Sequence, residues 1–136
     1  MSQITVIREQ APVGKLNIDI SKVLATRGGK QAVLLIDDSA IARKTLTKNL
    51  EYYGFEVIEA DAGISGLKLF LEKKREIAIV ILDLVLTDVP GQAVLAKLQQ
   101  LDPEVKVIVC TESASTEFKQ TGQQVAGVLR KPISTD

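Results

Sequence analysis

Five residues with chemically active side chains each follow a short apolar run in this chain of 136 residues. In an open parallel sheet the carboxyl ends of the strands form one edge, so residues that follow different strands can meet there. If the apolar runs are such strands, three carboxylates, one hydroxyl and one ammonium group share a single cleft. The residues that we predict to meet in this cleft are Asp37, Asp38, Asp83, Thr111 and Lys131.

The three carboxylates of this predicted cleft would repel one another, and a hard divalent cation would relieve the repulsion. Mg²⁺ prefers oxygen ligands, binds through one or two carboxylates and keeps waters that a phosphoryl group can replace. The residue types therefore predict a Mg²⁺ site that is suited to phosphoryl chemistry.

Composition excludes several other kinds of site. The chain has no histidine, which removes histidine-based catalysis and histidine-ligated metals. Its single cysteine, Cys110, excludes an intrachain disulfide, and its apolar context predicts a small core residue.

The charge balance gives no electrostatic reason to expect nucleic acid or a membrane as partner, because Lys and Arg total 17, and so do Asp and Glu. No apolar run approaches the length of a membrane span, and we expect a cytoplasmic protein.

The elements that must position the cleft alternate along the chain. Short continuous apolar runs predict buried parallel strands, and the amphipathic stretches between them predict covering helices. The pattern predicts an α/β doubly wound domain. The strands are expected at residues 32–36, 55–60, 77–82, 105–110 and 125–130.

Three helices are predicted between these strands. Ser39 opens the first, whose apolar positions end at Tyr53, and Gly54 is expected just past its end. Pro90 and Gly91 mark the entry to the third helix, which Asp102 and Pro103 terminate after Leu101. The apolar stripe of the second helix is formed by Ile64, Leu67, Phe70 and Leu71. In addition to these three, a fourth helix, shorter and weaker, is expected between Ser113 and Gln124.

Residues 1–30 are predicted to be an N-terminal extension or linker, and residues 31–136 the α/β domain. The extension could form a hairpin, or a short helix over residues 18–25, and periodicity leaves both open. The extension could equally be a disordered tail, or an element that replaces a covering helix or docks on a partner chain. The second possibility arises because no helix is predicted after the last strand to cover the sheet.

The chain resembles the receiver domain of two-component response regulators. The resemblance is carried by Asp37-Asp38-Ser39, the segment from Asp83 to Gly91, Thr111 and Lys131-Pro132. The resemblance covers Lys30 to Pro132, and fits a chemotaxis-type single domain or a receiver excised from a longer protein. It implies a flavodoxin-like fold with five strands in the order 2-1-3-4-5.

The resemblance also implies a role for each residue of the cleft. Asp83 would be the phosphoacceptor, with Thr111 and Lys131 contacting the phosphoryl oxygens. Asp38 and Asp83 would bind Mg²⁺ directly, Asp37 through water, and the backbone carbonyl of Val85 would complete the protein ligands.

Two function hypotheses follow from this resemblance. In the first, a sensor histidine kinase or phosphotransfer protein phosphorylates Asp83, and the conformational change controls contacts with a downstream protein. In the second, the domain is a constitutive interaction or dimerisation module that does not switch. Two residues favour the second hypothesis: the family usually has a small residue at the position of Glu112 and often an aromatic residue at the position of Val128. The missing last helix favours it as well.

Other functions fit the residues less well. A phosphohydrolase of the haloacid dehalogenase type needs a second acid two residues after the nucleophile, where this chain has Val85. We therefore expect no enzyme beyond self-catalysed phosphorylation and dephosphorylation. Both hypotheses require protein partners, a homodimer among them, and neither requires nucleic acid or a membrane.

Overall fold

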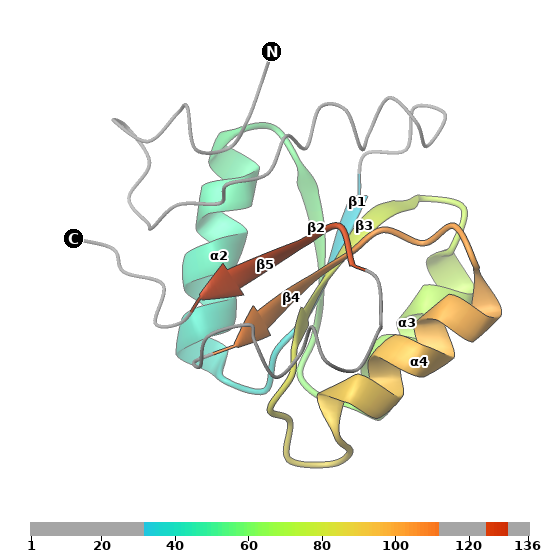
Figure 1. Ribbon diagram of the computed structural model, residues 1–136. Coiled ribbons are helices and arrows are strands. Elements are labelled where there is room, and N and C mark those ends of the chain that lie inside the picture. The colour runs from blue at the N-terminus through green and yellow to red at the C-terminus, as the bar shows by residue number, and fades with distance from the viewer. Residues whose placement is uncertain (1–31, 112–124, 131–136) are drawn as a thin grey trace.

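A computed structural model of the chain describes residues 32–111 and 125–130 (Figure 1). The predictions made for residues 1–30, for a helix between Ser113 and Gln124, for Glu112, for Lys131 and for the end of the chain lie outside the described residues.

The described residues form five strands and three helices, which alternate from β1 to β4, and the five strands form one parallel sheet in the order β2-β1-β3-β4-β5. This confirms the predicted α/β class, the doubly wound sheet and the implied strand order. The elements are β1 (Ala32–Ile36), α2 (Ala40–Tyr52), β2 (Glu56–Ala60), α3 (Gly63–Lys73), β3 (Ile77–Asp83), α4 (Gly91–Leu101), β4 (Val107–Thr111) and β5 (Gly127–Arg130).

Helices cover both faces of the sheet, with α2 on one side and α3 and α4 on the other (Figure 1). Alternate residues of the central strands point to opposite faces, so one apolar run supplies two cores. The strand residues that pack on the α2 side include Val33, Leu35, Ile79, Ile81, Ile108 and Cys110. Those on the α3 and α4 side include Leu34, Ile36, Val80, Leu82, Val107 and Val109.

Helix α2 begins after Ser39 as the sequence predicts, and it ends at Tyr52, one residue before the last predicted apolar position. The Ser39 hydroxyl accepts a hydrogen bond from the backbone N–H of Ala42 at 3.2 Å, which caps the helix. Gly54 follows the helix with φ of 92° and donates to the carbonyl of Glu51 at 3.0 Å. Because a left-handed φ favours glycine, this residue fixes the turn into β2.

The apolar stripe predicted for α3 is wrong at two positions. Phe70 is buried, but Ile64 and Leu71 are 48% and 57% exposed. The helix instead buries Gly63 and Gly66 together with Phe70. A Cβ atom on Gly66 would lie 2.5 Å from Ile36 Cδ1, so the glycines let the helix approach the sheet closely and turn Ile64 and Leu71 outward.

Several strand boundaries also differ from the prediction: β2 begins at Glu56 rather than at residue 55, and β3 and β4 each end one residue later than expected, at Asp83 and Thr111. Strand β4 begins at Val107 rather than at residue 105, because the N–H of Val105 donates to the carbonyl of Asp102 at 3.0 Å in the turn that follows α4. Strand β5 begins at Gly127 rather than at residue 125. Among the described helices, none has the length and apolarity needed to cross a membrane.

A buried hydroxyl on α2 gives a test of the packing. Thr47 is 9% exposed, and its Oγ1 atom has no hydrogen-bond partner among the described residues. Because an unsatisfied buried hydroxyl is destabilising, Thr47→Val is expected to raise the free energy of unfolding by about 1 kcal/mol. Urea denaturation measures the change. Thr45→Val on the same helix is the control, with an expected change within about 0.5 kcal/mol, and a loss of stability in Thr47→Val would contradict the assignment.

Candidate metal centre

Two of the predicted residues follow adjacent strands at the sheet centre. Strands β1 and β3 pair in parallel, and Ile36 lies opposite Leu82. Asp37 follows Ile36 directly, and Asp83 is the last residue of β3. The register therefore places Asp37 and Asp83 side by side at the carboxyl edge of the sheet.

Three carboxylates converge at this edge. One carboxylate oxygen from each of Asp37, Asp38 and Asp83 lies within 4.8 Å of the others. Asp37 is fully buried, Asp83 is 3% exposed and Asp38 is half-buried. Buried charges are costly unless they are paired or coordinate a metal, so this cluster is the feature of the described chain that most needs a cation.

A hydrogen-bonded loop holds Asp37 in place. Its backbone N–H donates to the carbonyl of Ala60 at 3.1 Å, and Oδ1 accepts from the N–H of Ser39 at 2.9 Å. The guanidinium of Arg43 donates to the Asp37 carbonyl at 2.8 Å and to Glu59 Oε1 at 2.9 Å. Arg43 thereby ties the start of α2 to β2 beside the carboxylates.

Asp83 is oriented by the segment that follows it. Its Oδ1 atom accepts a hydrogen bond from the N–H of Val85 at 3.0 Å. The N–H of Leu84 donates to the Cys110 carbonyl at 3.1 Å, which continues the contact with β4 beyond the strand. Val85 itself is 71% exposed, so the loop reaches the surface two residues after Asp83.

The remaining predicted residues belong to the ends of β4 and β5. Thr111 is the last residue of β4 and pairs with Arg130, and Cys110 pairs with Asp83. The backbone therefore brings Thr111 to the edge that carries Asp83. Lys131 follows Arg130 in the sequence but lies outside the described residues.

Sequence reasoning missed two residues that support the site. Arg43 lay in the first turn of the predicted first helix, close in sequence to Asp37, and that proximity is the signal that could have pointed to it. Asp88 accepts hydrogen bonds from Gly63 and Ile64, which are 25 and 24 residues away. Nothing in the spacing of Asp88 signals this contact, although Ala62 at the helix entry lacks a capping side chain.

The donor set fits a hard divalent cation. All three side chains offer carboxylate oxygens, which are the ligands that hard divalent cations prefer. The absence of sulfur and nitrogen donors from the cluster disfavours zinc or copper.

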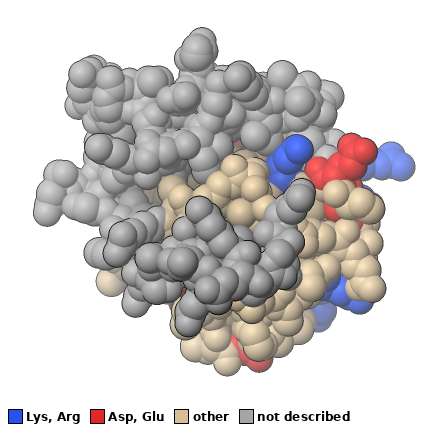
Figure 2. All heavy atoms as spheres, in the orientation of Figure 1, with Lys and Arg blue, Asp and Glu red and all other residues tan. Residues whose placement is uncertain are grey.

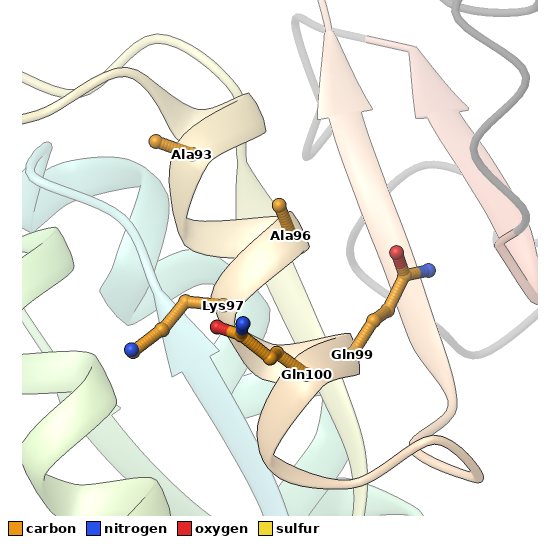
Figure 3. Close-up of a pocket in the computed structure, with 5 residues that line it drawn as sticks. All are labelled: Ala93, Ala96, Lys97, Gln99 and Gln100. Atoms are coloured by element: carbon orange, nitrogen blue, oxygen red, sulfur yellow. The ribbon is translucent and has the colours of Figure 1, made fainter.

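Other surfaces of the described chain offer less chemistry. A shallow pocket over α4 is lined by Ala93, Ala96, Lys97, Gln99 and Gln100, none of them acidic (Figure 3). On the face drawn in Figure 2, basic and acidic side chains of the described residues are interspersed. The acidic cluster is therefore the candidate functional site.

Comparison with known proteins relates this fold and cluster to one family. The sequence model of the response regulator receiver domain matches residues 33–136. Sensor kinase CckA of Brucella abortus is 29% identical over 128 residues, which cover 93% of this chain and 13% of the kinase. The Bordetella pertussis regulator BvgA, named as a putative positive transcription regulator of virulence factors, is 41% identical over 87 residues, or 63% of this chain and 41% of BvgA.

Solved structures agree. A response regulator receiver domain protein of Clostridium thermocellum has a TM-score of 0.71 at 26% identity, over 77% of this chain and 85% of that one. The chain spans less than half the length of the curated relatives that it matches. With its five-stranded sheet, its carboxylate cluster and a family match over most of its length, this chain belongs to the receiver domain family of two-component response regulators.

Proposed function

We propose that this receiver domain is a phosphoacceptor: Asp83 takes a phosphoryl group, in a Mg²⁺-dependent reaction, from a sensor histidine kinase or a phosphotransfer protein. The observation that carries the proposal is the convergence of Asp37, Asp38 and Asp83 within 4.8 Å at the carboxyl edge of the sheet. Membership of the receiver family supports the same role for the cluster.

In this proposal the protein ligands of Mg²⁺ are Asp38, Asp83 and the Val85 carbonyl, with Asp37 acting through water. When bound, the ion supplies positive charge next to the phosphoryl oxygens. The hydrogen bond from Val85 N–H to Asp83 Oδ1 fixes the plane of the carboxylate before the donor arrives.

The chemical step is an in-line displacement at phosphorus. An Asp83 carboxylate oxygen forms the new O–P bond, and the bond between phosphorus and the donor breaks, its electron pair leaving with the donor. Thr111 donates its hydroxyl to a phosphoryl oxygen, and the Lys131 ammonium neutralises charge on another. The product is an acyl phosphate on Asp83.

The output of the acyl phosphate is a change in protein contacts. The phosphoryl group carries about −1.5 to −2 of charge in place of the single negative charge of the Asp83 carboxylate, and it brings new acceptor oxygens. The added charge and acceptors bias the domain between two surface arrangements. A downstream protein that binds one arrangement better then reads the signal, in the cytoplasm and without nucleic acid contacting this domain.

A second candidate function is a receiver that binds partners or a second copy constitutively. The packing of Val128 favours it, because this half-buried residue of β5 contacts the core on the α3 and α4 side and has no ring to reorient. Amide NMR shifts on adding beryllofluoride and Mg²⁺ separate the two functions. A switch changes residues far from Asp83, whereas a passive module changes only residues around the cluster.

Phosphorylation from a small donor tests the proposal. Incubated with acetyl phosphate and Mg²⁺, the purified chain is expected to gain the mass of one phosphoryl group, and EDTA is expected to prevent the gain. Intact-mass spectrometry measures both. Phosphorylation that persists at full rate in EDTA, or no phosphorylation from either acetyl phosphate or a histidine kinase, would contradict the proposed function.

A further inference from the structure

The N-terminus of α3 is capped by a residue from another part of the chain. The first amides of a helix have no partner within it and need acceptors. Ala62, the N-cap residue of α3, makes no side-chain hydrogen bond to them. The carboxylate of Asp88 does so instead, because its Oδ1 accepts from Gly63 N–H and its Oδ2 from Ile64 N–H, both at 2.9 Å.

Asp88 belongs to the loop between β3 and α4, and this loop packs against the same helix end. A Cβ atom on Gly63 would lie 2.5 Å from Val89 Cγ2 and 2.8 Å from Val94 Cγ2. The absence of a side chain at Gly63 therefore permits the close approach that the two hydrogen bonds of Asp88 require. The backbone hydrogen bonds from Ile64 and Gly63 also lower the pKa of Asp88, so its carboxylate is charged at neutral pH.

The two hydrogen bonds that Asp88 accepts form a tie between the loop and α3. This tie joins the segments that hold the two buried carboxylates, Asp37 and Asp83. On the α3 side, Ala60 accepts the hydrogen bond of Asp37 N–H at 3.1 Å, two residues before Ala62. On the loop side, Val85 donates to Asp83 Oδ1 at 3.0 Å, three residues before Asp88. Movement of the loop away from α3 would shift Val85 relative to Asp37.

We propose that Asp88 is a positioning residue for the metal and phosphoryl site, where it ties the loop after Asp83 to the N-terminus of α3. The tie holds the Val85 carbonyl and the Asp83 carboxylate in the arrangement that the ion requires. This inference rests on the proposed function of the cluster, and it adds to that function a residue that does not itself touch the ion.

Two variants separate the tie from simple helix capping. Asp88→Ala removes both the cap and the tie. Ala62→Asp combined with Asp88→Ala restores a capping carboxylate within α3 and keeps the net charge, but it leaves the loop untied. Mg²⁺ affinity, measured by calorimetry on the purified chain, and thermal unfolding, measured by circular dichroism, are determined for each.

Asp88→Ala is expected to lower the melting temperature by about 4 °C and to weaken Mg²⁺ binding about tenfold. The double variant is expected to regain the melting temperature to within about 1 °C while Mg²⁺ binding stays roughly tenfold weaker. Ile77→Val, at the opposite end of β3 from Asp83, is the control: it lowers the melting temperature but leaves Mg²⁺ affinity unchanged.

Recovery of Mg²⁺ affinity in the double variant would overturn the proposal, because Asp88 would then act only as a helix cap. Unchanged Mg²⁺ affinity in Asp88→Ala would overturn it as well, whatever the melting temperatures. If the double variant does not regain stability, Asp88→Ala is compared with the destabilised Ile77→Val. Weaker Mg²⁺ binding in Asp88→Ala alone supports the proposal, and equally weakened binding in both variants overturns it. Failure of the unaltered chain to bind Mg²⁺ would instead refute the proposed function itself.

Discussion

Asp83→Asn is expected to abolish phosphorylation of the chain by acetyl phosphate, to below the detection limit of intact-mass spectrometry. An amide is not a nucleophile towards phosphorus under these conditions. The two carboxylates that remain in the cluster follow β1 rather than β3, so neither takes the position of Asp83. The variant also loses one of three carboxylates that lie within 4.8 Å, so Mg²⁺ binding is expected to weaken.

The fold is expected to survive this substitution. Asparagine has nearly the size of aspartate and keeps an Oδ1 acceptor for the N–H of Val85. Glu76→Gln is the matched control, because this exposed carboxylate precedes β3 at the opposite edge of the sheet, and the control is expected to be phosphorylated normally. Full phosphorylation of Asp83→Asn would exclude Asp83 as the acceptor.

Gly91→Ala is expected to disrupt both stability and the site. A Cβ atom at this position would lie 2.4 to 2.7 Å from the Cα, carbonyl oxygen and carbonyl carbon of Leu84, which cannot move as a flexible side chain could. The N–H of Gly91 also closes the loop by donating to the Leu84 carbonyl at 3.0 Å. Because Leu84 follows Asp83 directly, its displacement moves the acceptor.

We expect Gly91→Ala to lower the free energy of unfolding by about 2–3 kcal/mol in urea denaturation, and to slow phosphorylation of the fraction that remains folded. Gly54→Ala is the control. Its φ of 92° makes alanine unfavourable, but no atom lies within 4 Å and the turn precedes β2, away from the cluster. It is expected to cost about 1–2 kcal/mol without affecting phosphorylation. A stability change within about 0.5 kcal/mol in Gly91→Ala would show that the loop relaxes freely.

The fold could be predicted from the sequence because buried parallel strands have a distinctive pattern. Runs such as 77–82 are apolar at every position, since both faces of β3 are covered. The strand order came from the family resemblance and not from the pattern. The side of α3 that is buried could not be predicted. Gly63 and Gly66 allow close contact with Val89 and Ile36, so the glycine side faces the core and the larger Ile64 and Leu71 face outward.

The cluster of three aspartates was also predictable, since each residue sits where a strand ends and parallel strands end together. Its supports were less accessible. The Arg43 guanidinium donates hydrogen bonds to the Asp37 carbonyl and to Glu59 Oε1. Asp88 caps a helix that begins 25 residues earlier in the sequence. Such contacts depend on how loops pack on the finished sheet, and no local pattern of residue types encodes them. The roles of Thr111 and Lys131 remain predictions from the sequence.

The central claim is that Asp83 accepts the phosphoryl group, and reductive trapping tests it most directly. Borohydride reduces an aspartyl phosphate to homoserine, because hydride attacks the activated acyl carbon and phosphate leaves. After phosphorylation of the purified chain and peptide mapping by mass spectrometry, we expect homoserine at position 83 alone, and none when EDTA is present during phosphorylation. Homoserine at position 37 or 38, or phosphate that survives reduction on a serine or threonine, would contradict the proposed function.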